Sequence, residues 1–272
     1  MDLIRLLIRN WLSRVLLFVY VALFVFWINI YLSGSQEGFI NNLFGALYPL
    51  ISLSGGIFGL VVVSKKWGGM KSLIGRGVIF LSLGLLAEVF GQWAWSYFVV
   101  IKQVEIPYPS IADFGYFLIV PFYALAMYNF AKASGVRVGL KSMMGKLQAI
   151  AIPVLMIVIA YTLFLQHVEV DLSNPLRTFL DFGYPGFEAI AISIGILTYS
   201  LSVGVLGGVM RSRILLIVLA LVAQYITDYT FLYRVGTETY YNGGPVDLMY
   251  MTSLLIMSFG IISLNRLEET KS

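Results

Sequence analysis

The chain of 272 residues is 59% hydrophobic and only 12% charged, with a mean hydropathy of +0.87, whereas a soluble domain is nearer half apolar and one quarter charged. A chain of this size cannot bury so much apolar surface in its own core, so the composition predicts an integral membrane protein. The absence of cysteine excludes disulfides and thiolate metal sites, and the single histidine, His167, excludes sites built from several imidazoles.

The first apolar run is predicted to be a spanning helix and not a signal peptide. Arg5, Arg9 and Arg14 come before the run from Val15 to Ile30. This run is longer than the hydrophobic region of a signal peptide, and no small-residue cleavage pattern follows it. We therefore expect the segment to be retained as the first span.

Eight segments are long and apolar enough to cross a bilayer. A spanning helix needs about 20 mostly apolar residues, because the hydrocarbon offers no hydrogen-bond partner to a bare backbone. The predicted spans are 15–33, 41–64, 77–101, 114–131, 147–166, 180–203, 213–233 and 247–265. The predicted fold is therefore all-α, a polytopic membrane helix bundle that forms one integral membrane domain over residues 1–272.

The basic residues set the predicted orientation. With the N-terminus inside, the inner loops and tails carry 15 of the 18 basic residues and leave Lys102, Arg177 and Arg234 outside. The inner residues are Arg5, Arg9, Arg14, Lys65, Lys66, Lys71, Arg76, Lys132, Arg137, Lys141, Lys146, Arg211, Arg213, Arg266 and Lys271. By the positive-inside rule, both termini are expected in the cytoplasm. We expect the membrane to be the plasma membrane.

The acidic residues show the opposite distribution. Only Asp2, Glu268 and Glu269 fall at the inner face, while Glu88 and Glu188 fall within helices. The others lie at or near the outer face: Glu37, Glu105, Asp113, Glu169, Asp171, Asp181, Asp228, Glu238 and Asp247. We therefore expect the outer half of the bundle to be acidic.

The chain looks duplicated at an offset of 136 residues, half its length. The matches are Tyr48-Pro49 with Tyr184-Pro185, Gly59 with Gly195, Leu83, Ala87 and Tyr97 with Leu219, Ala223 and Tyr233, and, after a two-residue gap, Asp113-x-x-Tyr116 with Asp247-x-x-Tyr250. They share one register across three loops, although apolar helices also resemble one another by chance. Two halves of four helices, 1–136 and 137–272, would form a parallel tandem repeat about an axis along the membrane normal.

Two acids lie near helix N-termini that follow outer loops, Asp113 after Pro107–Ala112 and Asp247 after Gly243-Gly244-Pro245. A carboxylate in this position caps free N–H groups and meets the positive end of the helix dipole, which explains both acids without a ligand. Tyr116 and Tyr250, three residues further on, share the face of each acid. The alternative is that acid and phenol line an outward-open pocket.

A strip of polar side chains is predicted in the outer half of the bundle. Glu88 and Gln92 lie one turn apart, as do Gln224 and Asp228 at the corresponding positions, and Glu188 lies in the sixth span. An intramembrane carboxylate is costly and is a functional candidate by default, and no lysine or arginine lies deep in a helix to pair with these acids. The strip either faces a ligand, water or a cation, or joins helices by hydrogen bonds.

Aromatic side chains gather at the predicted outer ends of the third and seventh spans. They are Trp93, Trp95, Tyr97, Tyr229, Tyr233, Tyr240 and Tyr241. An aromatic belt at the membrane interface accounts for them, and stacking or cation–π recognition of a ligand is the alternative. Pro49, Pro121 and Pro185 lie within predicted helices and are expected to kink them, which would help to open a cavity.

Three short motifs give a family resemblance over most of residues 40–265. They are Pro107-Tyr108-Pro109-Ser110-Ile111-Ala112-Asp113-Phe114-Gly115-Tyr116, Tyr184-Pro185-x-x-Glu188 and Gly243-Gly244-Pro245-Val246-Asp247. They resemble the eight-helix membrane input domains that precede GGDEF diguanylate cyclase and histidine kinase modules. The resemblance implies that the helices sense a signal and pass it to a cytoplasmic output domain. Only residues 265–272 stand where that domain would begin, so we expect signalling through a separate partner.

The sequence therefore predicts a membrane sensor with an outward-facing acidic and aromatic pocket and a cytoplasmic signalling protein as its partner. The predicted ligand-binding residues are Glu88, Gln92, Trp93, Asp113, Tyr116, Tyr184, Glu188, Gln224, Asp228, Asp247 and Tyr250. The alternatives are a transporter or channel for a cation or small polar solute, an intramembrane enzyme that uses carboxylates as acid and base, and a scaffold subunit. We expect a lipid bilayer around the chain, and no catalytic residue, metal site or nucleic-acid partner; the sequence identifies no cofactor.

Overall fold

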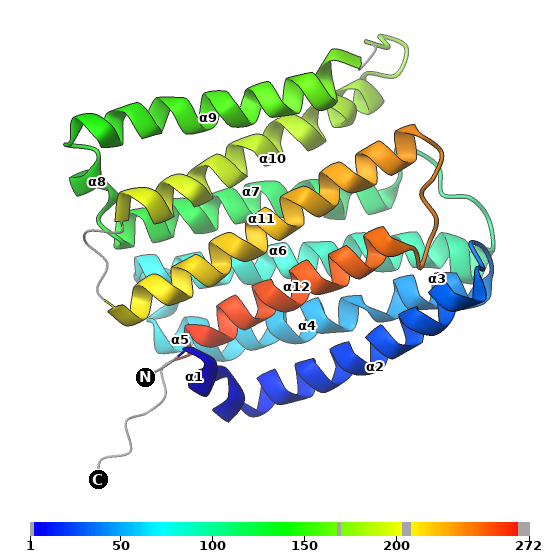
Figure 1. The fold of residues 1–272 in the computed structure, drawn as a ribbon, viewed down its shortest axis with the longest axis horizontal. Coiled ribbons are helices and arrows are strands. Elements are labelled where there is room, and N and C mark those ends of the chain that lie inside the picture. The colour runs from blue at the N-terminus through cyan, green and yellow to red at the C-terminus, as the bar shows by residue number, and fades with distance from the viewer. Residues whose placement is uncertain (1–2, 168–169, 203–207, 266–272) are drawn as a thin grey trace.

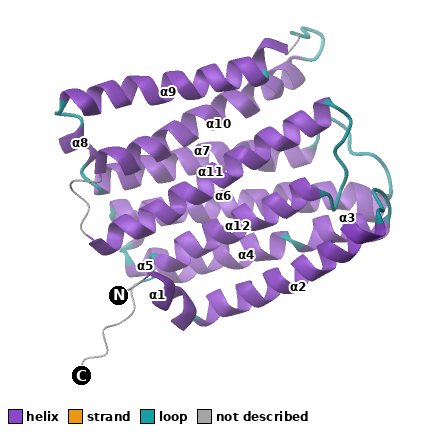
Figure 2. Ribbon diagram, viewed as in Figure 1, coloured by secondary structure: helices purple, strands orange, loops and turns teal. Residues whose placement is uncertain are grey.

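The computed structural model describes residues 3–167, 170–202 and 208–265, and within these ranges the chain is helical with short connections and no strand (Figure 2). In chain order the helices are α1 (Leu3–Arg9), α2 (Trp11–Ser33), α3 (Phe39–Leu47), α4 (Pro49–Phe58), η1 (Gly59–Val63), α5 (Ser64–Lys66), η2 (Gly69–Lys71), α6 (Leu73–Ser96), η3 (Tyr97–Lys102), α7 (Ile111–Ala133), α8 (Val136–Gly139), α9 (Met143–Leu163), η4 (Leu165–His167), α10 (Pro175–Ser202), α11 (Gly208–Gly236) and α12 (Pro245–Ser263). The predicted all-α fold is confirmed.

Eight helical stretches of the described chain are long and apolar enough to cross a membrane, as predicted. They are Trp11–Ser33, Phe39–Lys66, Leu73–Lys102, Ile111–Ala133, Met143–Leu163, Pro175–Leu201, Met210–Gly236 and Pro245–Ser263. Most begin a few residues before the predicted span. Helix N-termini recruit polar capping residues that an apolar run does not include, so hydropathy places the start too late.

Side-chain caps fix where several of these helices begin. The Ser72 hydroxyl accepts the N–H of Gly75 at the start of α6, and the Ser142 hydroxyl accepts the N–H of Gly145 at the start of α9, each over 2.9 Å. Asn10 caps α2 in the same way. Each cap satisfies an N–H group that has no partner within its own helix, which stabilises the first turn.

Pro49 lies at a local interruption of the second span, whose helical stretch nevertheless runs from Phe39 to Lys66 because Tyr48 keeps a helical backbone. α3 ends at Leu47, and α4 begins at Pro49 in its first turn. Proline is suited to the first helical position, because its missing N–H would have no intrahelical partner there. Pro121 and Pro185 do lie inside α7 and α10.

Six of the helices form a closed ring, and the other two long helices lie outside it. The neighbours around the ring, each packed on the next, are α4, α6, α7, α10, α11 and α12, and α12 closes the ring on α4. Figure 1 shows α2 and α9 at opposite edges of the bundle, where α2 packs against α12 and α4, and α9 against α10. Both expose large apolar side chains, such as Phe18, Leu32 and Ile150, as expected for surfaces in lipid.

α6 and α7 approach one another through small residues. A Cβ atom on Gly115 of α7 would lie 2.5 Å from the backbone nitrogen of Gly91 and 2.7 Å from the carbonyl oxygen of Ala87, both on α6. Gly84 of α6 lies under the ring of Tyr123, where an added Cβ would be 2.3 Å from a ring carbon. Residues without a side chain therefore let the two backbones meet, and α6 and α7 hold their polar residues at a fixed separation.

The connections alternate between the two ends of the bundle (Figure 1). One end carries α1, α5 and α8, and we call it the basic end because the described basic residues predicted to be inside lie there. The other carries the connections 34–38, 103–110, 170–174 and 237–244, and we call it the acidic end. Arg266, Lys271, Asp2, Glu169, Glu268 and Glu269 lie outside the described residues, as does the side chain of Arg137.

Candidate functional site

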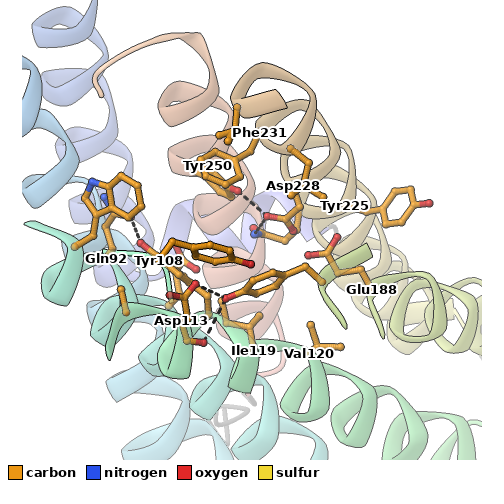
Figure 3. Close-up of a pocket in the computed structure, with 18 of the residues that line it drawn as sticks. Gln92, Tyr108, Asp113, Ile119, Val120, Glu188, Tyr225, Asp228, Phe231 and Tyr250 are labelled. Carbon is orange, nitrogen blue, oxygen red and sulfur yellow. Dashed lines mark hydrogen bonds between the residues drawn. The ribbon is translucent and has the colours of Figure 1, made fainter. Parts of the chain in front are cut away.

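The ring encloses a cavity of about 490 Å³ in the half of the bundle nearer the acidic end (Figure 3). Side chains of α6, α7, α10, α11 and α12 line it, together with Tyr48 at the junction of α3 and α4 and residues of the connections 103–110 and 237–244. Ten of the eleven predicted residues face this one space: Glu88, Gln92, Asp113, Tyr116, Tyr184, Glu188, Gln224, Asp228, Asp247 and Tyr250.

Trp93 is the predicted residue that the structure leaves outside the cavity. Its side chain is 41% exposed, and its indole N–H donates to the carbonyl oxygen of Ala46 over 3.1 Å. Trp95, two residues along α6, lines the cavity instead and meets the ring of Tyr240 edge-on at 6.5 Å. Residues two apart on a helix point in nearly opposite directions, so the aromatic pattern located the helix end but not its inner face.

Asp113 both caps α7 and faces the cavity, so its two interpretations from sequence are compatible. One carboxyl oxygen accepts the backbone N–H of Ser110 at 2.6 Å, which completes a capping box with that serine. The other accepts the hydroxyl of Tyr184 on α10 at 2.8 Å. The side chain therefore joins the start of α7 to α10 at the cavity wall.

Asp247 occupies the corresponding position at the start of α12. It is 1% exposed, and its carboxyl oxygens accept the backbone N–H of Gly243 at 2.7 Å and the hydroxyl of Tyr240 at 3.1 Å. Burial, and then the charge of Asp247, raise the pKa of the Tyr240 phenol well above its usual value. The phenol therefore stays protonated and remains a donor to the carboxyl group.

Two hydrogen bonds at the cavity wall each join a tyrosine to the neighbouring helix of the ring. The hydroxyl of Tyr116 donates to Gln92 over 2.7 Å, and the hydroxyl of Tyr250 donates to Asp228 over 2.8 Å. Gln224 also donates to Asp228, over 3.1 Å, and accepts the hydroxyl of Ser253. Each bond joins the middle of one helix to the next helix in the ring.

Glu188 lies near Asp228 at the cavity wall, close enough for their carboxyl groups to interact electrostatically (Figure 3). Two like charges so placed repel one another strongly in a low-dielectric interior, so the pair favours a shared proton or a nearby cation. The second oxygen of Glu188, Oε2, is buried and has no hydrogen-bond partner among the described residues. That oxygen is an acceptor that the protein itself leaves unused.

Glu88 lies deeper in the ring, on α6. The residue is 2% exposed and lines the cavity. Within the described part of the chain, no donor or cation contacts its carboxyl group, although the phenols of Tyr116, Tyr123 and Tyr250 lie near enough to interact electrostatically with it. A buried carboxyl group without a partner is costly, so its presence here calls for a function or a ligand.

The connection 103–110 is tied to α10 at the mouth of the cavity. The hydroxyl of Tyr108 donates to Asp181 over 2.6 Å, and the same carboxylate lies 3.7 Å from Nε of Arg177. Partial burial and the hydrogen bond to Asp181 raise the pKa of Tyr108, which keeps its proton on the phenol. Arg177 is the only cationic residue among those that line the cavity, and it is exposed beside this acid.

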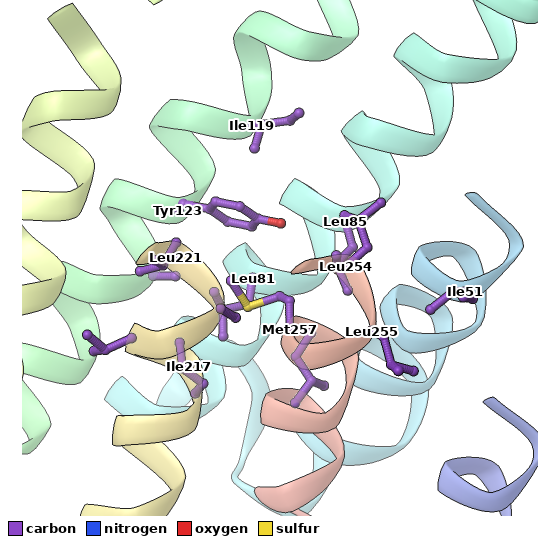
Figure 4. Packing of buried hydrophobic residues seen from close by; sticks show 14 of the residues in the cluster. Ile51, Leu81, Leu85, Ile119, Tyr123, Ile217, Leu221, Leu254, Leu255 and Met257 are labelled. Carbon is purple, nitrogen blue, oxygen red and sulfur yellow. The ribbon is translucent and has the colours of Figure 1, made fainter. Parts of the chain in front are cut away.

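Towards the basic end the cavity stops at tightly packed apolar side chains (Figure 4). Tyr123, Ile192 and Leu221 line its deepest part and are nearly buried. Beyond them lies a layer that we call the apolar floor, whose members are each at most 2% exposed: Leu81, Leu85, Ile217, Leu254 and Met257. Within the described part of the chain, the polar strip thus ends at a packed hydrophobic layer.

Several lining residues were not selected from the sequence. Tyr48 was noted only in the Tyr48-Pro49 match and Tyr108 only in the motif before Asp113, and neither position suggested that the side chain faces a cavity. Tyr123 belongs to no motif. Within the aromatic group at the outer ends, Trp95 and Tyr240 face the cavity, while Tyr97 and Tyr233 are exposed as a membrane belt would be. The side chain of His167 lies outside the described residues.

The eight apolar stretches and the cavity define a multi-pass helical membrane protein with an internal cavity lined by acidic and aromatic side chains. Among the described residues, no three histidine, aspartate or glutamate side chains come close enough to hold a metal ion. No family model, no curated protein and no solved structure matches the chain.

Proposed function

We propose that the chain is a membrane receptor domain that takes up a small ligand in its cavity and signals to a cytoplasmic partner. The observation that carries this proposal is the asymmetry of the ring along its axis. The half towards the acidic end is hollow and carries acidic and polar side chains on a largely apolar wall, and the half towards the basic end is filled by the apolar floor. Such a site binds a ligand from one side without providing a path to the other.

The charge distribution supports an outward-facing cavity. Lysines and arginines concentrate at the basic end, and the positive-inside rule assigns such an end to the cytoplasm. The carboxylates of Glu37, Glu105, Asp171 and Glu238 belong to connections at the acidic end. The mouth beside Tyr108 then faces the exterior, and both ends of the chain face the cytoplasm.

We also infer that the ring consists of two related halves. The bonds from Tyr116 to Gln92 and from Tyr250 to Asp228 join corresponding residues, and Asp113 and Asp247 each accept a backbone N–H at the start of corresponding helices. Around the ring, the order α4, α6, α7 is followed by α10, α11, α12. A cavity on the axis between the halves is the site at which a parallel repeat brings matching residues together.

The ring helices offer a route from the ligand to a partner. α6, α7, α10 and α11 each carry cavity residues and extend past the apolar floor to the basic end. A ligand that prefers one arrangement of these helices shifts their equilibrium and so changes the surface presented there. The resemblance to input domains of cyclases and kinases supports a signalling partner at that end.

Transport of a cation is the second candidate, because Glu188 and Asp228 place two carboxyl groups on the wall of one cavity inside the bilayer, where such groups commonly mark ion or proton pathways. It requires the apolar floor to open during a transport cycle. The floor is tightly packed in this structure, so we place the receptor first.

The orientation can be tested by labelling single cysteines, because the native chain has none. Leu172→Cys lies in an exposed connection at the acidic end, and Met70→Cys is exposed at the basic end. On intact cells, a membrane-impermeant maleimide should label Leu172→Cys and should label Met70→Cys only after permeabilisation. The reverse pattern would place the cavity mouth in the cytoplasm and overturn the receptor proposal.

Receptor and transporter can be separated by probing the deepest part of the cavity. Ile192→Cys faces the cavity and Ile217→Cys lies in the apolar floor. We expect a charged methanethiosulfonate reagent to modify Ile192→Cys in intact cells but not from the cytoplasmic face of inside-out vesicles. Ile217→Cys, the matched control, should stay unmodified from both sides. Modification of both cysteines from the cytoplasmic face would favour transport.

A further inference from the structure

We propose that the cavity binds an organic monocation, a protonated amine or quaternary ammonium group attached to an apolar body. This rests on the proposed function, since the bound cation would be the signal that the receptor detects. The inference follows from the charge of the lining, from unpartnered acceptors inside it, and from the aromatic rings that line the same cavity.

The lining is strongly acidic. Five carboxyl groups face the cavity, from Glu88, Asp113, Glu188, Asp228 and Asp247, and a sixth, from Asp181, lies at the mouth. No lysine is among the lining residues, and the one arginine is at the mouth, beside Asp181. Below the mouth, no cationic side chain of the described residues would compensate an anionic ligand, whereas a cation would offset the charge of the carboxyl groups.

Glu88 and Glu188 supply unused acceptors in the interior. Glu88 is buried, with only 2% of its surface exposed. Its carboxyl group nevertheless has neither a hydrogen bond nor an ion pair among the described residues. Oε2 of Glu188 is likewise buried without a donor. A donor is therefore missing on both sides of the cavity, and an ammonium group is a donor with the complementary charge.

Aromatic rings line the same cavity as these acceptors. Tyr116, Tyr123 and Tyr250 belong to its wall together with Glu88, and Phe231 stands against Tyr240 and Tyr250 with ring centroids 4.9 and 6.3 Å apart. Ring faces attract cations, and cages of aromatic side chains with a carboxylate are the usual way in which proteins recognise alkylated ammonium groups. The deeper wall of Ile192 and Leu221 offers apolar contact to the remainder of such a molecule.

The geometry favours an organic cation over an inorganic one. A cavity of about 490 Å³ is far larger than a metal ion and lies in the range of pockets for small organic ligands. The carboxyl groups are also spread along the walls, since no three of them in the described chain converge on a point. A diffuse charge on a carbon framework can contact several of them in turn, whereas a divalent metal needs ligands at a single centre.

The test compares three probes of one shape and different charge: 2-phenylethylamine, 2-phenylethanol and phenylacetate. Each is added to the purified full chain in detergent, and the melting temperature is followed by tryptophan fluorescence. At saturating concentration we expect the amine to raise the melting temperature by about 5 °C and the other two to leave it unchanged. An equal shift with the alcohol, or a larger one with phenylacetate, would overturn the proposal.

Glu88→Gln keeps the size of the side chain and removes its charge, so it should abolish most of the shift produced by the amine. Glu105→Gln, an exposed acid on the connection 103–110, is the matched control and should retain it. If Glu88→Gln does not fold, direct displacement of the amine by tetraethylammonium in the native chain tests the same claim. If the amine binds but Ile192→Cys is modified from both membrane faces, the cavity binds an organic cation and the receptor proposal is wrong.

Discussion

Gly115→Ala is expected to lower the melting temperature by about 10 °C, which corresponds to about 3 kcal/mol in the free energy of unfolding. The added methyl group would lie 2.5 Å from the nitrogen of Gly91 and 2.7 Å from the carbonyl oxygen of Ala87. Both are backbone atoms of α6, so no side chain can rotate away and the two helices must separate. The separation would also move Glu88 and Tyr116 apart, because they belong to these helices.

The matched control for this substitution is Gly186→Ala on α10. Gly186 also lies inside a membrane helix, but no atom of a neighbouring element lies within 4 Å of its added Cβ. Alanine favours helix over glycine, so this variant should melt at the same temperature as the native chain or slightly above it. The two melting curves are compared by circular dichroism in one detergent. An equal drop in melting temperature in both variants would show that α6 and α7 do not pack closely at Gly115.

The spans could be predicted because the bilayer imposes a length and a composition on every helix that crosses it. All eight predicted ranges overlap a described helix, and the errors lie at the ends, as at Leu73 and Pro175. The interruption at Pro49 could not be predicted with the same rule. A proline inside an apolar run either kinks a helix or begins a new one, and the choice depends on whether tertiary packing supports the turn before it.

Most of the lining could be predicted because a polar side chain in a membrane helix must face other protein groups. Glu88, Gln92, Gln224 and Asp228 therefore turned inwards together. Aromatic residues carry no such constraint, since a tyrosine or tryptophan is stable at the lipid interface and in the interior. The sequence therefore placed Trp93 in the site, although the lining residue is Trp95.

The closed end of the cavity could not be predicted at all. Leu81, Ile217 and Met257 look like lipid-facing residues in the sequence, and only the arrangement of the ring shows that they meet one another in the centre. The contrast between polar and apolar halves is a property of the assembled helices. That contrast is why we propose a binding site and not a channel.

Asp247→Ala is expected to destabilise the protein by about 3 kcal/mol, the second large effect. The carboxyl group of Asp247 accepts the N–H of Gly243 and the hydroxyl of Tyr240 in a position that is 1% exposed. Alanine would leave the N–H of Gly243 buried without an acceptor and would remove one of the two acceptors of the Tyr240 hydroxyl, the other being Asn242. Because Tyr240 lines the cavity, the change should also weaken binding of the amine probe, measured as a smaller rise in melting temperature.

Asp171→Ala is the matched comparison, because it removes a similar hydrogen-bond acceptor from an exposed position. Asp171 accepts the backbone N–H and the hydroxyl of Ser173 in a turn that is fully open to solvent. Water replaces the lost acceptor there, so the melting temperature should stay within error of the native value. Asp247→Asn keeps one acceptor oxygen and should fall between the two variants. If Asp247→Ala and Asp171→Ala have the same melting temperature, the carboxyl group of Asp247 does not hold the connection 237–244 against the ring.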